Sequence, residues 1–286
     1  MARKAWDKLK GMRTGAFVLA LAGATCLHAQ WLDHPTPGIP RTANGKPKLT
    51  APAPRAPGGK PNLSGLWVTE SAPRELLARL IPDGTNGAGE EPLSQYFINI
   101  FSDFQPSDVP FLPDAAKQFE QRARAFTQTS PLSHCLPEGM PLVEMAPAPY
   151  KIIQTPGIIA MLYERDTTYR QVYTDGRSLP IDPQPSWLGY SAGKWEGDTL
   201  VVNTNGLNDR GWLDARGHTH SEALRITERF HRRDFGHMEV QMTFDDPRTY
   251  SKPFTIKLQQ HLMPDTDLLE SYCAENEKDA AHMDAK

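Results

Sequence analysis

The sequence is poor in cysteine, in positive charge and in long apolar runs, and each shortage excludes a class of protein. Three cysteines in 286 residues are too few for a disulfide-rich miniprotein or for a zinc site of four thiolates. A formal net charge of −3 lacks the basic excess that is typical of nucleic-acid-binding proteins. No Gly-rich phosphate loop occurs, which argues against a Rossmann nucleotide site. Proline, in contrast, is plentiful, and its 26 residues favour strands, turns and irregular loops over long helices.

Residues 1–29 have the features of a secretory signal peptide. Five basic residues precede an apolar segment, 16–27, that is too short to span a bilayer. Ala29 suits the last position before cleavage, so we predict a secreted or periplasmic chain that begins at Gln30. Removal of the leader leaves 26 basic and 33 acidic side chains, a net charge of −7. This charge disfavours nucleic acid and anionic membrane surfaces as partners, and no other segment approaches transmembrane length.

Secretion affects how the remaining two cysteines are interpreted. An oxidising compartment would pair Cys135 with Cys273, and two unpaired buried thiols are the alternative. We expect four parts in the chain: the signal peptide (1–29), a Pro-rich extended arm (30–61), a β-domain (62–276) and a tail (277–286). The arm contains a near-repeat at 44–49 and 59–63, and it either tethers the domain or wraps over it.

Helical patterns are confined largely to an insertion at residues 70–130. Segment 73–80 has Pro in its first turn. Segment 94–104 has an apolar stripe at i, i+3, i+4 and i+7, and segment 114–127 has a clear helix start. The insertion is either a lid over a cavity or ordinary packing on the outside of a sheet.

From residue 150 onward, short alternating segments separated by turns dominate. They predict about eight antiparallel strands, with a hairpin at Asp175-Gly176 and a last strand at 268–273. The fold class is therefore mostly β, an antiparallel β-barrel of the lipocalin or calycin type. Gly65-x-Trp67 at the first strand is similar to the lipocalin motif, whose Trp packs across the closed end of the barrel.

Several long runs resemble an uncharacterised family of secreted bacterial β-rich proteins, mostly labelled hypothetical. These runs include GKPNLSGLW, TYRQVYTDGR, GKWEGDTLVVNTNG and GHTHSEALRITERF. The resemblance covers nearly the whole mature chain and implies that these segments belong together. It brings no catalytic residue to this sequence.

The densest polar cluster is a loop of about fifteen residues, 208–222, between two predicted strands; loops of this length are often functional. On a strand, His218, His220 and Glu222 would share one face. They would suit a divalent metal such as iron, manganese or zinc, with His237 or His261 completing the set. Metal-free acid–base chemistry is the second interpretation. Its candidate catalytic residues are His218, His220, Glu222, Asp214 and Arg216. A purely structural loop is the third.

Aromatic side chains in the β region suggest a pocket for one small ligand inside the barrel. The candidate ligand-binding residues are Tyr169, Arg170, Tyr173 and Trp195. Two functions remain open. The first is an enzyme (isomerase, lyase or hydrolase type) that acts on a small, partly apolar molecule through the His218–Glu222 loop. The second is a periplasmic carrier that binds such a molecule without chemistry.

Overall fold

The structure is a computed structural model that describes residues 34–81, 93–125 and 129–273. The predicted signal peptide and C-terminal tail lie outside these residues, so both remain predictions. Within the described part of the chain, no helix is long and apolar enough to cross a bilayer.

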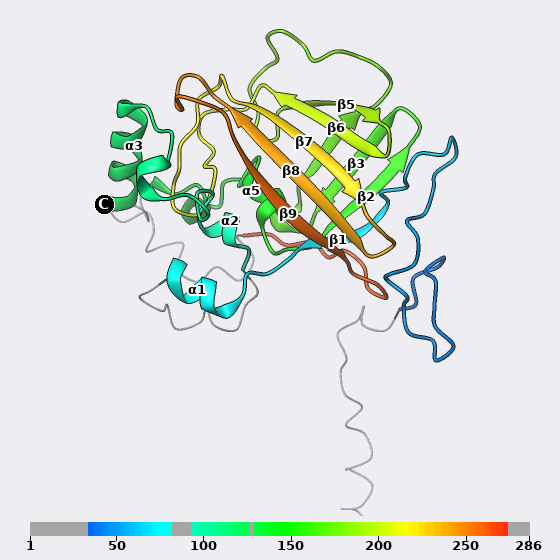
Figure 1. Ribbon diagram of the computed structural model, residues 1–286. Coiled ribbons are helices and arrows are strands. Elements are labelled where there is room, and N and C mark those ends of the chain that lie inside the picture. The colour runs from blue at the N-terminus through cyan, green and yellow to red at the C-terminus, as the bar shows by residue number, and fades with distance from the viewer. Residues whose placement is uncertain (1–33, 82–92, 126–128, 274–286) are drawn as a thin grey trace, which may run out of the picture.

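Nine strands close into one barrel, each paired with its neighbours in chain order, and β9 closes against β1 (Figure 1). The strands are β1 (Gly65–Thr69), β2 (Tyr150–Thr155), β3 (Ile158–Tyr163), β4 (Tyr169–Tyr173), β5 (Tyr190–Glu196), β6 (Thr199–Asn205), β7 (Arg225–Arg232), β8 (His237–Asp245) and β9 (Phe254–Leu262). Alternate side chains point inward, as the period of two predicts. The predicted mostly-β barrel is confirmed, and nine strands are close to the expected eight.

One strand pair differs from the prediction, because β4 and β5 are parallel while the other eight pairings are antiparallel. Strands that strictly alternate in direction can close into a ring only if their number is even, so nine strands require at least one parallel pair. The crossover 174–189 supplies it by returning the chain to the same end of the barrel. The hairpin predicted at Asp175-Gly176 is therefore wrong, since these residues only begin this crossover.

The last strand predicted at 268–273 is also wrong. This segment is irregular, and side-chain contacts hold it in place of a strand ladder. Lys151 Nζ lies 2.6 Å from Asp267 Oδ1, and the hydroxyl of Thr167 donates to the carbonyl of Ser271 at 3.0 Å. Leu269 is exposed, so the segment has no buried face that would set a strand register.

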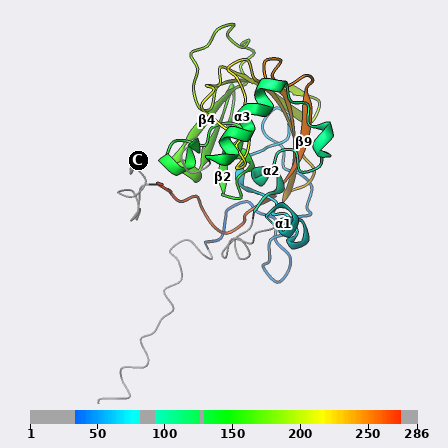
Figure 2. The ribbon, with the colours of Figure 1, turned by 90° about the vertical axis from the view of Figure 1, so that its left-hand side faces the viewer.

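The α-helices of the described residues are α1 (Arg74–Leu80), α2 (Gln95–Ile98), α3 (Pro113–Arg124) and α5 (Leu142–Met145), with 3₁₀ turns η1 (Pro106–Asp108), η2 (Leu132–His134) and η3 (Arg165–Thr167). Figures 1 and 2 show α1, α2 and α3 together on one side of the barrel. The helix expected at 94–104 ends at Ile98. Ile100 and Phe101 are nevertheless buried, because irregular chain places them against the core.

α5 lies beyond the predicted insertion, and its four residues are all buried. Side chains from three strands reach Glu144 of this helix. Thr69 donates to its carbonyl at 2.8 Å, and Tyr163 and Arg170 donate to its carboxylate at 2.7 and 3.0 Å. These contacts enclose α5 within the barrel strands.

Trp67 of the Gly-x-Trp motif is fully buried in β1. Its Nε1 donates to the carbonyl of Leu63 at 2.9 Å, and the guanidinium carbon of Arg232 lies 4.8 Å from its ring centroid. Arg232 at the end of β7 therefore covers this ring, and Trp67 packs in the core.

The Pro-rich arm wraps over the barrel by using one structural motif twice. The segments 40–49 (PRTANGKPKL) and 54–63 (PRAPGGKPNL) repeat with a period of 14 residues. In both, the Arg donates to the carbonyl of the Gly four residues later at 2.9 Å. Arg41 then pairs with Asp265, and Arg55 pairs with Asp198 at 2.7 Å. Of the two possibilities left open for the arm, the structure shows the wrapped one.

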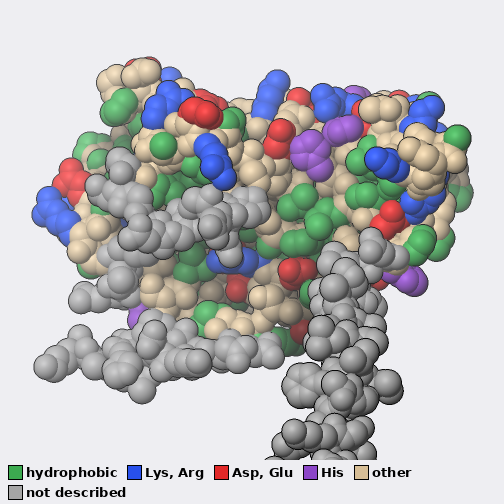
Figure 3. Space-filling model, turned by 90° about the horizontal axis from the view of Figure 1, so that it is seen from below, with side chains coloured by type: hydrophobic (Ala, Val, Ile, Leu, Met, Phe, Trp, Pro, Cys, Tyr) green, Lys and Arg blue, Asp and Glu red, His purple; other side chains and the backbone are tan. Residues whose placement is uncertain are grey.

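Cys135 and Cys273 form a disulfide, with their Cα atoms 5.4 Å apart, which confirms the predicted pairing. It joins the chain before α5 to the irregular segment after β9, not to a strand. A crosslink across 138 residues stabilises by about 4–5 kcal/mol in the chain-entropy model. On the face shown in Figure 3, acidic, basic and histidine side chains are interspersed, and neither sign of charge forms a large patch.

Candidate active site

The loop between β6 and β7 is folded into the molecule beneath α3. Most of its side chains between positions 211 and 220 are buried. A Cβ added at Gly217 would lie 3.4 Å from both the Cβ of Arg122 on α3 and the ring of Trp212. This close approach packs the loop against the helix.

Asp214 and His218 form a buried pair that organises the loop. One carboxylate oxygen of Asp214 accepts the main-chain N–H groups of Arg216 and His218 at 2.9 and 3.2 Å. The other accepts the N–H of Ile100 at 2.7 Å and lies 2.5 Å from His218 Nδ1. The His218 ring stacks on Phe119, with centroids 4.2 Å apart. These contacts are those of a structural anchor that ties the loop to α3 and to the segment after α2.

His220 is buried in a different way. Its Nδ1 lies 3.1 Å from the carbonyl oxygen of Ser221, so Nδ1 carries the proton and Nε2 the lone pair. Nε2 is buried and has no hydrogen-bond partner. Burial lowers the pKa of His220 because it penalises the charged form. The imidazole is therefore neutral at neutral pH, with an unused acceptor.

His220 lines a cleft of about 530 Å³ between α3 and the loop. The other lining side chains are mostly polar: Asp114, Gln118, Gln121, Arg122, Thr129, Asp209, Thr219, Ser221, Arg248 and Thr249, with Ala115 and Ala125. This volume is that of a site for a small organic molecule.

Arg122 is the residue of this cleft that the sequence analysis missed. Its Nη1 is buried without a hydrogen-bond partner, and its guanidinium carbon lies 5.7 Å from the Trp212 ring centroid. Burial lowers its pKa, while the charge of Asp209 acts in the opposite direction. No carboxylate of the described residues lies within ion-pair distance of Arg122. In the sequence it resembles Arg124 two positions later, which is 80% exposed, so only the packing of the loop distinguishes them.

The other predicted site residues do not converge on the cleft. Glu222 is exposed, and Arg216 donates to the carbonyl of Leu80 at 2.6 Å, which ties the loop to α1. Residues 218–222 are not a strand, so the shared face expected for His218, His220 and Glu222 is wrong. No group of three or more His, Cys, Asp or Glu among the described residues is arranged to hold a metal ion. The expected metal ligands therefore do not fit such a site.

The two histidines suggested as additional ligands lie elsewhere. His237 and His261 face each other across β8 and β9, with ring centroids 5.3 Å apart. His237 Nδ1 is 2.6 Å from Asp234 Oδ1, and His261 Nε2 is 3.5 Å from Glu70 Oε2. Each is thus engaged with a carboxylate away from the His220 cleft.

Arg170 occupies the barrel interior, but all five of its N–H groups are used within the protein. It contacts the carboxylates of Glu144 and Glu228 and the hydroxyls of Ser191 and Thr204. Burial and the neighbouring charge of Glu228 raise the pKa of Glu144 to about 7. Arg170 consequently has no donor left for a ligand.

The remaining predicted ligand residues separate into two places. Tyr169 and Tyr173 line a groove of about 450 Å³ beside β4 and β5, together with Arg170. Trp195 is not among the residues that line this groove and packs against the hydrophobic core instead.

A standard serine hydrolase is not expected from the sequence for want of a Gly-x-Ser-x-Gly elbow, but the pattern itself does occur at 189–193. Such a pattern marks a nucleophile only on a sharp strand-to-helix turn. Here Ser191 lies inside β5, is buried, and contacts Arg170 Nε and Thr204 Oγ1 at 3.0 and 2.9 Å. The serine is therefore part of the interior network.

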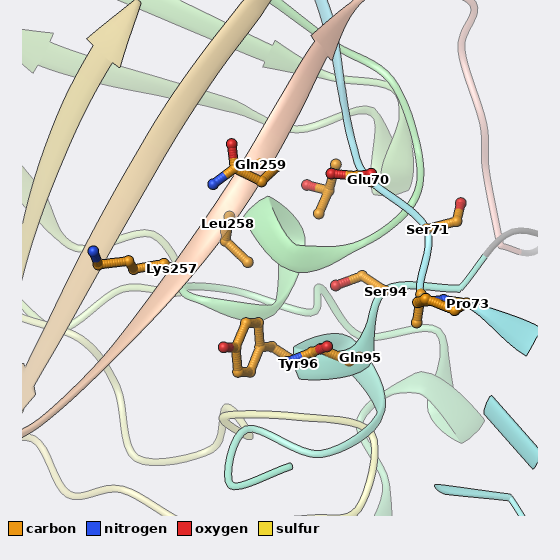
Figure 4. Close-up of a pocket in the computed structure, with 11 residues that line it drawn as sticks. Glu70, Ser71, Pro73, Ser94, Gln95, Tyr96, Lys257, Leu258 and Gln259 are labelled. Carbon is orange, nitrogen blue, oxygen red and sulfur yellow. The ribbon is translucent and has the colours of Figure 1, made fainter. Parts of the chain in front are cut away.

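A smaller groove of about 280 Å³ lies beside β9. Figure 4 shows Lys257 and Gln259 on β9, Glu70 on the chain that follows β1, and Tyr96 on α2. Two of its ionisable groups already have partners, since Tyr96 donates to Asp103 and Glu70 lies near His261. The His220 cleft is the stronger candidate because its buried groups lack partners.

Comparison with protein-family models finds no matching family, and comparison with curated proteins finds no match.

Proposed function

We propose that this protein is a secreted enzyme that acts on a small, partly apolar molecule bearing a carboxylate, with His220 as the base. One observation carries the proposal. His220 Nε2 and Arg122 Nη1 are buried at the same cleft, and neither has a hydrogen-bond partner. Buried polar groups are nearly always hydrogen-bonded, and leaving one unpaired costs about 1–3 kcal/mol. Two exceptions at one cleft indicate that a bound molecule supplies the missing partners.

The two groups require different partners. The guanidinium of Arg122 is a charged donor, and a carboxylate oxygen suits it best. The Nε2 of His220 is a lone-pair acceptor, and a hydrogen that can be removed as a proton suits it. A molecule with such a hydrogen close to a carboxylate satisfies both.

The proposed step is proton transfer at the carbon next to the carboxylate or another carbonyl group. The C–H bond breaks, its proton moves to His220 Nε2, and its electron pair moves onto the oxygen that faces Arg122. The guanidinium stabilises the resulting oxyanion. Return of the proton at a different carbon gives an isomerase, and loss of a leaving group gives a lyase. Water activated by the same base gives a hydrolase.

The experiment is hydrogen–deuterium exchange at carbon in D₂O. The purified mature protein is incubated with a set of small carboxylic acids, and proton NMR follows their C–H signals and any new product. We expect one or more acids to exchange or react with the wild-type protein and to stay unchanged with His220→Gln. His231→Gln is the matched control, because His231 is an exposed histidine on β7.

The outcomes separate the alternatives. Exchange that persists in His220→Gln contradicts the role of His220. Binding of an acid without exchange or reaction in any variant favours the carrier function and contradicts the enzyme.

Secretion is part of the same proposal. The Cys135–Cys273 disulfide is typical of proteins outside the cytoplasm, and a leader cleaved after Ala29 would explain it. N-terminal sequencing of protein recovered from the periplasm or the medium tests this. A first residue of Gln30 supports the proposal, and Met1 contradicts it.

A further inference from the structure

We propose that the groove beside β4 and β5 is a second binding site, for a neutral pyranose sugar. The two strands pair only at Val172↔Ser191 and Tyr173↔Ala192. Before these positions the strands separate, and the groove of about 450 Å³ lies between them. The parallel pair that an odd-stranded barrel requires is thus also where its wall opens.

The walls of this groove are aromatic. Tyr169, Tyr173, Trp187 and Tyr190 all line it. Tyr169 has 65% of its surface exposed, and Tyr173 and Tyr190 stack with centroids 5.3 Å apart. Aromatic rings gathered in an open groove favour a ligand with a flat, apolar face.

Neighbouring arginines hold two of these rings in position. The guanidinium carbon of Arg177 lies 3.8 Å from the Tyr173 ring centroid, and that of Arg210 lies 4.8 Å from the Trp187 ring centroid. Arg177 is itself paired with Asp175 at 2.6 Å. Because these contacts restrain the two rings, binding would lose little side-chain freedom.

The polar groups of the groove are uncharged or already neutralised. Hydroxyl and amide groups line it, from Thr167, Thr168, Gln171, Ser186 and Ser191. Arg170 is the only charged residue in this lining, and its N–H groups are all engaged with protein partners. Among the lining residues, therefore, an anion would find no free cation and a cation would find no carboxylate.

A neutral pyranose matches these features. One face of the ring presents C–H groups that pack on an aromatic side chain, and the hydroxyl rim needs hydrogen-bond partners. This site does not depend on the proposed acid–base chemistry. The two sites are neighbours, because Asp209 lines the His220 cleft and the next residue, Arg210, covers Trp187.

Saturation-transfer difference NMR tests this proposal with the methyl glycosides of glucose, galactose, mannose and N-acetylglucosamine. We expect saturation of ring C–H protons for at least one glycoside. Tyr169→Ala should weaken its affinity about tenfold, which corresponds to about 1.4 kcal/mol and lies within the range for a stacked aromatic ring. Ile153→Ala is the control, because Ile153 is an exposed apolar side chain on β2.

Several results would overturn the proposal. The first is the absence of saturation for all four glycosides. The second is equal glycoside affinity in Tyr169→Ala and wild-type protein. The third is loss of glycoside binding in His220→Gln but not in Tyr169→Ala. The last would place the sugar in the cleft. Binding of phenol in the groove without any glycoside would instead assign it to planar aromatic molecules. A thermal melt of each variant verifies folding. Replacement of the exposed Tyr169 should change the melting temperature little.

Discussion

The imidazole of His220 packs against Gly211, so that a Cβ added at residue 211 would lie 3.1 Å from Nε2. The missing side chain leaves room beside the one ring nitrogen that has no partner. Gly211 is not one of the described glycines with a positive φ angle, so its backbone conformation does not require glycine. Its small size is needed instead for the space around His220.

Gly211→Ala should therefore impair the site while the barrel stays folded. The added methyl group displaces the imidazole or fills the space next to Nε2. We expect carbon–hydrogen exchange to fall at least about tenfold and stability to fall by about 1–3 kcal/mol, as for other overpacked positions. The NMR exchange assay and urea unfolding measure both. An unaltered exchange rate would show that Nε2 is not the base.

Arg122→Met should abolish carboxylate binding and leave the protein at least as stable. The guanidinium pays for burial without an ion-pair partner, whereas methionine keeps the packing against Trp212 without the charge. Calorimetric titration with benzoate measures binding, and thermal melting measures stability. Arg124→Met, at an exposed position of the same helix, should bind benzoate normally. Equal benzoate affinity in both variants would contradict the role of Arg122.

Asp214→Asn should lower stability more than His220→Gln does. Asp214 accepts hydrogen bonds from three main-chain N–H groups and contacts His218, so weakening them should cost about 1–3 kcal/mol. His220 uses only Nδ1, and Gln should lower stability by less than about 1 kcal/mol. Urea unfolding of both variants compares them. A larger loss in His220→Gln would identify His220 as the structural residue.

The protein should become less stable as the pH rises from about 5 to about 8. Burial, with the charge of Glu228, raises the pKa of Glu144 from 4.5 to about 7, and burial raises that of Glu138 to about 7. Between the ordinary pKa of 4.5 and the raised pKa of about 7, the folded state keeps protons that the unfolded state has released. The free energy of unfolding therefore declines with increasing pH. Urea midpoints at several pH values measure the trend. Glu144→Gln should flatten it, and a midpoint that rises with pH would contradict this origin.

Removal of the disulfide should destabilise the protein by about 2–5 kcal/mol. The bond closes a segment of 138 residues, so its loss mainly increases the conformational entropy of the unfolded chain. Thermal melting with and without dithiothreitol, and of the Cys135→Ser/Cys273→Ser double variant, measures the effect. The bond would be contradicted if dithiothreitol left the melting temperature of the wild-type protein unchanged and both thiols were free before the reductant was added.

Local patterns in the sequence were sufficient for most of the fold. Alternation of apolar and polar residues located the strands, because in a barrel every second side chain faces the core. Met238, Val240, Met242 and Phe244 follow this rule and are all buried. The pairing of Cys135 with Cys273 followed from their being the only cysteines after the leader.

Direction and closure depended on the whole chain. The pattern of residues 168–174 predicts a strand, but no local sequence pattern indicates that the next strand, β5, runs parallel to it. That outcome depends on the parity of nine strands and on the route of the crossover. The failure of the strand predicted at 268–273 has a similar origin, since β1 already pairs with β2 and β9.

The sequence by itself determined the strands of the barrel, the helical insertion and the loop that carries the candidate site. Only the tertiary structure decided which residues of that loop are available for chemistry. His218 and His220 are two positions apart and look equivalent in the sequence. The first is engaged by Asp214 and Phe119, and the second faces the cleft with a free nitrogen. Arg122 joins it from a helix almost a hundred positions earlier. The reason is physical: burial and hydrogen-bond partners come from residues distant in the chain, and they decide whether a polar side chain is an anchor or a reactive group.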